Sequence, residues 1–204
     1  MEVPGLREGV GELMNLQDYY MTADLHEPPM MHQREFGIIR KDKGMWRHLA
    51  FSNMGKLRAF LIEQRPLHVY FSVAKYSDPS NIIMAEKGRL GTDLIFDIDY
   101  DALKVPTLGE AAYQIMELSG ILKDKFALKD LTMVFSGSRG YHIHVRDDCI
   151  QSLNRYERSQ IVDYVIARGI EIDAPVTCDM SRLIRLPGSI HGKTMHECRI
   201  IKVD

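Results

Sequence analysis

The sequence has few cysteines, little net charge and no long apolar segment, and each absence excludes a class of protein. The three cysteines are widely spaced, so a reducing compartment is favoured and no disulfide framework is expected for Cys149, Cys178 and Cys198. A net charge of −2 excludes a polybasic coat for nucleic acid, so any cationic binding surface must be local. No apolar run approaches the roughly 18 to 20 residues that span a bilayer, so we expect no membrane contact.

The N-terminus also lacks the pattern of a signal peptide, because Glu2, Arg7 and Glu8 interrupt the region that would have to be apolar. The chain has 204 residues, of which 45% are hydrophobic and 26% charged, and we find no internal repeat in it. This length allows one large domain or two tightly joined halves with a substantial core. A cytoplasmic globular protein is therefore expected.

Short helical and strand patterns are interleaved along the chain. Alternating apolar residues predict strands at residues 35–40, 45–51, 67–74, 92–99, 131–135 and 141–145. Helical spacing of apolar residues predicts helices at residues 11–22, 54–63, 108–123 and 153–168, the second with Asn53 as its N-cap. Residues 76–91 have the composition of a polar connection, and residues 170–203 that of short strands between turns. Because hairpins connect several strands, an α+β fold is favoured over a doubly wound parallel sheet.

The strand predicted at residues 92–99 carries several carboxylates on one face. Alternation along a strand places Asp93, Asp97 and Asp99 on one side, opposite the apolar residues Leu94, Phe96 and Ile98. Aligned carboxylates repel one another and are costly to dehydrate, so folding alone gives no reason for this pattern. A hard divalent cation would compensate the charge, but a solvent-exposed strand face is an equally good explanation of these residues alone.

A second stretch, residues 134–145, combines a polar turn with two histidines on one face of a strand. Its sequence is Val-Phe-Ser-Gly-Ser-Arg-Gly-Tyr-His-Ile-His-Val. Glycines allow backbone N–H groups to approach an anion, and Ser136, Ser138 and Arg139 add further donors. Since His142 and His144 follow on the same face, an anion site is favoured over an ordinary hairpin with surface histidines.

A third stretch, residues 177–194, places a carboxylate next to several cations. Asp179 precedes a run that contains Arg182, Arg185, His191 and Lys193. Such a mixture suits a site where metal and polyphosphate meet, although this stretch taken alone is better explained as a solvated charged loop. Its Gly-Lys-Thr triplet is not a Walker A loop, because Pro187 stands where that motif requires a glycine.

Together these stretches resemble the catalytic (small) subunit of archaeal DNA primase, a member of the archaeo-eukaryotic primase superfamily. The resemblance is carried by GTDLIFDIDYD, FSGSRGYHIHV and DMSRLIRLPGSIHGKT, with further similarity in REFGII, MWRHLAF and PLHVYFSVAKY. It extends from about residue 34 to residue 194. It implies an α+β primase core with mixed or antiparallel sheets flanked by helices. Residues 1–204 would form a single catalytic domain, with an N-terminal αβ half at residues 1–85 and an RRM-like, metal- and nucleotide-binding half at residues 86–204.

The resemblance also implies roles for individual residues. The metal-binding aspartates would be Asp97, Asp99 and Asp179, the last of which completes the catalytic site. The phosphates of the incoming nucleotide would contact Ser136, Arg139, His142, His191 and Lys193. Supporting positions near the site would be Asp93, Arg185 and Ser138, the last standing where many relatives have a second arginine. His144 is expected to be a partly buried strand residue. Core or surface roles are favoured for three further candidates for template or nucleotide contact, Tyr70, Arg34 and Arg47.

The activity implied by the resemblance is template-directed nucleotidyl transfer with two Mg²⁺ or Mn²⁺ ions. The chain would be a DNA-directed nucleotidyltransferase, the RNA polymerase of the primosome that synthesises short primers in DNA replication. The implied partners are nucleoside triphosphates, a single-stranded DNA template and a primase large subunit, in the cytoplasm at the nucleoid. A primase-like repair or gap-filling polymerase and a non-catalytic accessory subunit remain alternatives. A metal-dependent nuclease would not need the triphosphate anchors.

The sequence departs from the family pattern in two respects. Several relatives carry a zinc-binding knuckle after the first aspartate pair, but residues 100–130 contain neither Cys nor His, so no zinc is expected. Residues 143–178, which separate His142 from Asp179, are too few for the helical insertion of full-length relatives. We therefore expect a minimal catalytic core, either natural or shortened.

Overall fold

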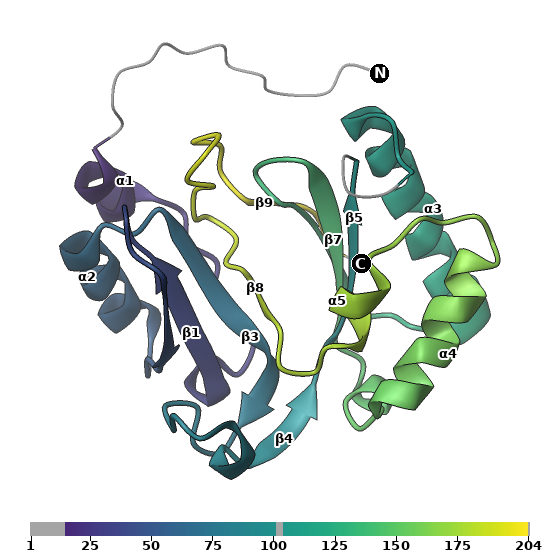
Figure 1. Ribbon diagram of the computed structural model, residues 1–204, viewed down its shortest axis with the longest axis horizontal. Helices are drawn as coiled ribbons and strands as arrows, with labels where there is room; N and C mark the ends of the chain where they lie inside the picture. The colour runs from purple at the N-terminus through teal and green to yellow at the C-terminus, as the bar shows by residue number, and fades with distance from the viewer. Residues whose placement is uncertain (1–14, 101–103, 204) are drawn as a thin grey trace.

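The computed structural model describes residues 15–100 and 104–203. Two antiparallel sheets occupy the middle of the molecule, and helices cover their outer sides (Figure 1). This arrangement confirms the predicted α+β class with antiparallel sheets flanked by helices. In the described part of the chain, no helix combines the length and the apolar character needed to cross a bilayer.

The first sheet has the strand order β2-β1-β3-β4, and β8 also pairs with β3. Its strands are β1 (Arg34–Ile39), β2 (Met45–Leu49), β3 (His68–Tyr76), β4 (Arg89–Thr92) and β8 (Leu183–Arg185). The expectation of a polar connection over residues 76–91 was wrong at its end, because β4 pairs with the end of β3. Both β4 and β8 lie beyond residue 85, so the first sheet draws strands from both predicted halves, and the division of the domain at that residue stays a prediction.

The second sheet has the order β5-β7-β6-β9. Its strands are β5 (Leu94–Asp99), β6 (Leu131–Phe135), β7 (Gly140–Val145) and β9 (Arg199–Val203). The chain order β5, α3, β6, β7, α4, with β7 between β5 and β6, follows the β-α-β-β-α part of the split βαβ motif. This is the topology expected of the RRM-like half.

Each α-helix begins at a polar residue whose side chain accepts a hydrogen bond from the first turn. The helices are α1 (Leu16–Thr22), α2 (Met54–Gln64), α3 (Leu108–Phe126), α4 (Arg155–Ile166) and α5 (Ala174–Cys178). Their N-caps are Asn15, Asn53, Thr107, Asn154 and Asp173. The predicted helix at residues 11–22 lies in part outside the described residues, and α5 was not predicted. Short 3₁₀ turns occur at Met31–Gln33, Met84–Glu86 and Asp148–Ile150.

Alternation along β5 divides its side chains between two hydrophobic cores. Leu94, Phe96 and Ile98 pack into the core between the second sheet and helices α3 and α4. Ile95 points the other way and joins the core of the first sheet, which includes Phe36. The predicted two-faced strand is therefore confirmed, and its polar face is directed toward the first sheet.

Candidate active site

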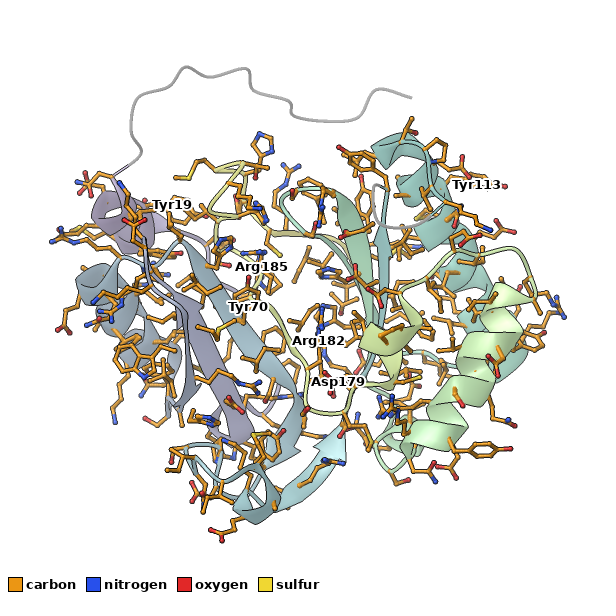
Figure 2. All side chains as sticks on the ribbon, viewed as in Figure 1. Tyr19, Tyr70, Tyr113, Asp179, Arg182 and Arg185 are labelled. Carbon is orange, nitrogen blue, oxygen red and sulfur yellow. The ribbon has the colours of Figure 1, made fainter. Side chains whose placement is uncertain are left out.

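A cavity of about 200 Å³ brings most of the predicted site residues together. Both sheets contribute to its walls, and Figure 2 shows Tyr70, Arg182 and Arg185 near one another in the middle of the molecule. Among the residues that line it are eight predicted ones, namely Asp97, Asp99, Ser136, Ser138, Arg139, His142, Arg185 and His191. The polar face of β5 is thus part of a cavity wall.

Asp97 is the most enclosed acidic residue of this cavity. It pairs in register with His142 of β7, and His142 Nε2 lies 3.3 Å from Asp97 Oδ1. Burial raises the pKa of Asp97, but His142, Arg182 and Arg139 outweigh this effect and hold the pKa below its ordinary value. Among the described residues, His142 is the side chain that pairs with this buried Oδ1. An ionised carboxylate is therefore held at the cavity wall beside His142.

Asp99 lies two residues further along the same face of β5, where the strand ends. Its Oδ2 is 3.5 Å from Nη2 of Arg139, which follows the polar turn between β6 and β7. Asp99 pairs in register with Gly140, and a Cβ at Gly140 would collide with the carbonyl oxygen of Ile98. A glycine is needed here so that β7 can approach the end of β5, and this close approach sets Arg139 beside Asp99.

The turn at residues 136–140 packs against the loop that carries His191. Ser136 Oγ accepts hydrogen bonds from the backbone N–H groups of Ser138 and Gly140, at 3.4 and 3.3 Å. Gly137 has a φ of +83°, and a Cβ there would meet the carbonyl oxygen of His196. Thr194 Oγ1 donates to the carbonyl oxygen of Gly137 at 2.6 Å. Two of the stretches that predicted phosphate contacts therefore meet in space.

Arg185 is a buried cation in the cavity wall whose hydrogen-bond partners are all neutral. Only 8% of the residue is exposed. Its guanidinium donates to His68 Nδ1 at 2.8 Å, to the carbonyl oxygen of Ile190 at 3.2 Å and to the Tyr70 hydroxyl at 3.3 Å. The guanidinium carbon lies 5.0 Å from the centre of the Tyr70 ring. Within the described residues no carboxylate forms an ion pair with Arg185, so its charge is available to an anion in the cavity.

The structure does not bring Asp179 to the other two aspartates. Asp179 is exposed, and its Oδ1 accepts hydrogen bonds from the backbone N–H and the hydroxyl of Ser181 at 2.9 and 2.7 Å. Figure 2 shows it on the segment that leads from α5 toward Arg182. Among the described residues, no group of three or more His, Cys, Asp and Glu side chains is arranged to hold a metal ion. The role of Asp179 as the third metal ligand stays a prediction.

The pair formed by Asp97 and Asp99 nevertheless fits a hard divalent cation. Carboxylate oxygens are the donors that Mg²⁺ and Mn²⁺ prefer, and the carboxylates of Asp97 and Asp99 both line the cavity. Arg139 and Arg182 already compensate part of the negative charge, since both lie close enough to lower the pKa of Asp97.

Comparison with known proteins supplies the family. A family model described as DNA primase small subunit matches residues 96–169. The DNA primase small subunit PriS of Archaeoglobus fulgidus is 32% identical over 253 residues, which cover 87% of this chain and 76% of that protein. This chain belongs to the DNA primase small subunit family. PriS of Haloarcula marismortui is 41% identical over 169 residues, and PriS of Pyrobaculum calidifontis is 34% identical over 229 residues. The chain spans 43% of the Haloarcula protein and 73% of the Pyrobaculum protein.

A solved structure supports the fold of this primase family member independently. The polymerase domain of Mycobacterium tuberculosis Ligase D, in complex with DNA, is similar with a TM-score of 0.58. The similarity covers 90% of this chain and 79% of that chain, at 18% sequence identity. At this level of identity the likeness establishes the arrangement of sheets and helices alone.

Besides Asp179, two predicted site residues lie away from the cavity wall. Asp93 does not line the cavity, because its carboxylate forms a buried ion pair with Arg34, in which Oδ2 and Nη2 are 2.8 Å apart. Asp93 therefore makes no contact with the cavity that would support its predicted role beside the metal site. Lys193 is exposed and does not line the cavity, although its charge contributes to lowering the pKa of both His68 and His191.

Three residues of the cavity region were missed or discounted from the sequence. Tyr70 and Arg182 line the cavity, and His68 contacts Arg185. The alternation of residues 67–74 already placed His68 and Tyr70 on the polar face of a strand, which was the available signal. Arg34 and Arg47 have structural roles, because Arg34 pairs with Asp93 and Arg47 with the buried Glu35. His144 is fully buried rather than partly buried, and it stacks on Phe71.

Proposed function

We propose that this chain is the catalytic subunit of a DNA primase, which synthesises short primers from nucleoside triphosphates on a single-stranded DNA template. The observation that carries the proposal is one cavity in which Asp97 and Asp99 occupy one wall and Arg185 stands with only neutral partners in another. Carboxylates of this kind suit a divalent ion, and an uncompensated arginine suits a phosphate. Nucleotidyl transfer needs both in one place.

In the proposed reaction the carboxylates bind the metal ions and the cations bind the triphosphate. Asp97 and Asp99, together with Asp179, would hold Mg²⁺ or Mn²⁺ ions. Such ions, when bound, lower the pKa of a primer 3′-hydroxyl and neutralise charge on the triphosphate. Arg139, Arg182 and Arg185 would bind the triphosphate from the other walls, so that the α-phosphate is oriented toward the hydroxyl.

In this proposal, further phosphate contacts come from the turn at residues 136–140 and from the loop that carries His191. Ser136 and Ser138 of the turn line the cavity together with His191, and their hydroxyls can donate to phosphate oxygens. His142 stays beside Asp97 and can bind either the carboxylate or a phosphate oxygen. Lys193 lies outside the wall and would add positive charge near His68 and His191. Because so many donors converge, binding energy can be used to orient the reacting atoms.

Synthesis on an unprimed template tests the proposal. The purified chain is incubated with circular single-stranded DNA, labelled ribo- or deoxynucleoside triphosphates and Mg²⁺ or Mn²⁺, with and without a primase large subunit. The proposal predicts short products that begin without a primer. Extension confined to primed templates would instead favour a repair or gap-filling polymerase, which would need the same residues.

A non-catalytic accessory subunit is the alternative of a different class. A module that only binds nucleic acid or a partner has no use for two aspartates that face a cationic wall. Titration of the chain with a triphosphate in the presence and absence of Mn²⁺ distinguishes the two. Metal-dependent binding is expected for the enzyme, whereas binding that ignores the metal would favour the accessory role. A large-subunit partner and a cytoplasmic location at the nucleoid follow from the proposal.

A further inference from the structure

His68 belongs to none of the predicted motifs, yet it makes the shortest hydrogen bond to Arg185. It is the first residue of β3 and is half-buried. Its Nδ1 lies 2.8 Å from Nη1 of Arg185, and the backbone N–H of Gly192 points at the same atom from 3.5 Å. A guanidinium can only donate hydrogen bonds, so Nδ1 must accept. His68 is therefore neutral in this arrangement, with its proton on Nε2.

The surroundings of the His68 ring favour this neutral form. Burial, Arg185 and Lys193, in that order, lower the pKa of His68 to about 4. The edge of the His191 ring and the face of the Tyr70 ring pack against it, at centroid distances of 5.1 and 6.1 Å. Neither neighbour brings a carboxylate to the imidazole. At neutral pH the acceptor that holds Arg185 thus carries no charge.

A neutral acceptor fixes the position of an arginine without cancelling its charge. A carboxylate at the same place would form a stronger, charge-assisted hydrogen bond, and it would also neutralise the guanidinium. The other partners of Arg185, the Ile190 carbonyl and the Tyr70 hydroxyl, are neutral as well. The fold therefore orients a buried cation in the cavity wall and leaves its full charge facing the cavity.

We propose that His68 is a positioning residue: its neutral Nδ1 holds Arg185 in the cavity wall so that the arginine's whole charge acts on the triphosphate of the nucleotide. The identity of the anion rests on the proposed function. For triphosphate binding, the absence of charge on the side chain at position 68 matters more than the volume of the imidazole ring.

The variants His68→Asn and His68→Asp separate these two properties. In both, an oxygen two bonds beyond Cβ replaces Nδ1, and the two side chains have nearly the same size. They differ in charge. His68→Asn keeps a neutral acceptor for Arg185, whereas His68→Asp places a carboxylate beside it. A role of the ring that is only structural would be lost equally in both.

The test measures binding of a non-hydrolysable nucleoside triphosphate by calorimetry, with Mg²⁺, for the wild-type chain and both variants. We expect His68→Asn to bind within about threefold of wild type and His68→Asp to bind at least about tenfold more weakly, the size of a lost charge-assisted contact. The loss should be smaller for a nucleoside monophosphate. In steady-state assays the KM for the nucleotide should rise in His68→Asp without a matching fall in kcat.

The melting temperature Tm should rank the two variants in the opposite order to their triphosphate affinity, or rank them equal. His68→Asp compensates the charge of Arg185, so its Tm should equal or exceed that of His68→Asn although it binds the triphosphate more weakly. Equal losses of binding in the two variants would overturn the inference and leave the proposed function intact. If the wild-type chain itself bound no triphosphate, the proposed function would fail and the inference with it.

Discussion

At the scale of single residues, the cavity is built from groups whose charge is set by their neighbours. Asp97 keeps a low pKa in spite of burial because His142, Arg182 and Arg139 surround it. His191 is held neutral, since burial, Arg185 and His68 lower its pKa to about 4. The cavity without nucleotide thus presents an ionised Asp97, several arginines and a neutral His191. A triphosphate would enter a site in which none of the described carboxylates forms an ion pair with Arg185.

Lys193→Ala tests the contribution of an exposed cation two residues beyond His191. Because Lys193 is solvated, we expect its loss to cost only about 1 kcal/mol of binding, which is about fivefold in the KM for the nucleotide. Steady-state kinetics at fixed template concentration measure this change. Lys125→Ala, which removes an exposed lysine from the last turn of α3, should leave KM unaltered. An unchanged KM in Lys193→Ala would remove that residue from the phosphate contacts.

His144 makes the stability of the protein depend on pH. It is fully buried, and neither ring nitrogen has a hydrogen-bond partner in the part of the chain that the structure describes. Burial, Arg146, His142 and Arg34 lower its pKa well below the ordinary value. Below a pH of about 6.5 the unfolded chain binds a proton at this position and the folded chain does not. The free energy of unfolding therefore falls as the pH decreases, by up to about 1.4 kcal/mol per pH unit.

The variant His144→Phe should lack this contribution while it keeps the stacking on Phe71. Urea unfolding between pH 8 and pH 5 measures the free energy of both proteins. We expect the free energies of unfolding of the two proteins to change equally with pH above pH 7. Below pH 7 the wild type should lose stability faster than His144→Phe. Parallel curves over the whole range would show that His144 does not titrate differently in the two states.

At the scale of secondary structure, the junction between β4 and β5 holds the two sheets together. Asp93 pairs with Arg34 of the first sheet, and both side chains are only 1% exposed. Arg158 of α4 donates to the carbonyl oxygens of Thr92 and Asp93, at 2.8 and 2.9 Å. Two arginines from different elements therefore converge on the residues where the chain passes from one sheet to the other.

Asp93→Asn should destabilise this junction because it leaves the buried Arg34 without its ion-pair partner. We expect a loss of about 3 kcal/mol or more in the free energy of unfolding, measured by urea denaturation. The matched control is Asp130→Asn, since Asp130 is half exposed and lies 3.8 Å from Arg146. Its pair should contribute less than about 1 kcal/mol. Similar losses in both variants would contradict the role given to the buried pair.

Local signals predicted most elements, and non-local contacts explain the ones that were missed. Asn53 and the apolar spacing of α2 are local features, and the helix forms where they predicted it. In contrast, β4 is four residues long and exists because the end of β3 lies beside it. Alternation correctly gave Asp93 the face of Asp97, but it could not reveal Arg34 as the partner of Asp93. That pairing depends on how two sheets pack.

At the scale of the whole molecule, the candidate site exists only where the two sheets meet. Tyr70 and Arg185 come from the first sheet, and Asp97 and His142 come from the second. The resemblance to the primase family predicted most of the cavity residues, because they lie in short sequence motifs. It could not predict that Arg185 would have neutral partners only, or that Asp179 would bind Ser181, since both depend on side-chain contacts in the folded chain.

The central claim, that this cavity performs nucleotidyl transfer, is tested most directly by Asp97→Asn. The variant removes the charge of the enclosed carboxylate and keeps its size, so circular dichroism should show an unchanged fold. The measurement is incorporation of labelled nucleotide on unprimed single-stranded DNA, with Asp148→Asn, an exposed position, as the control. We predict a loss of about 10³-fold or more in Asp97→Asn and wild-type rates in the control. Incorporation by Asp97→Asn at the wild-type rate would contradict the assignment of the cavity as the active site.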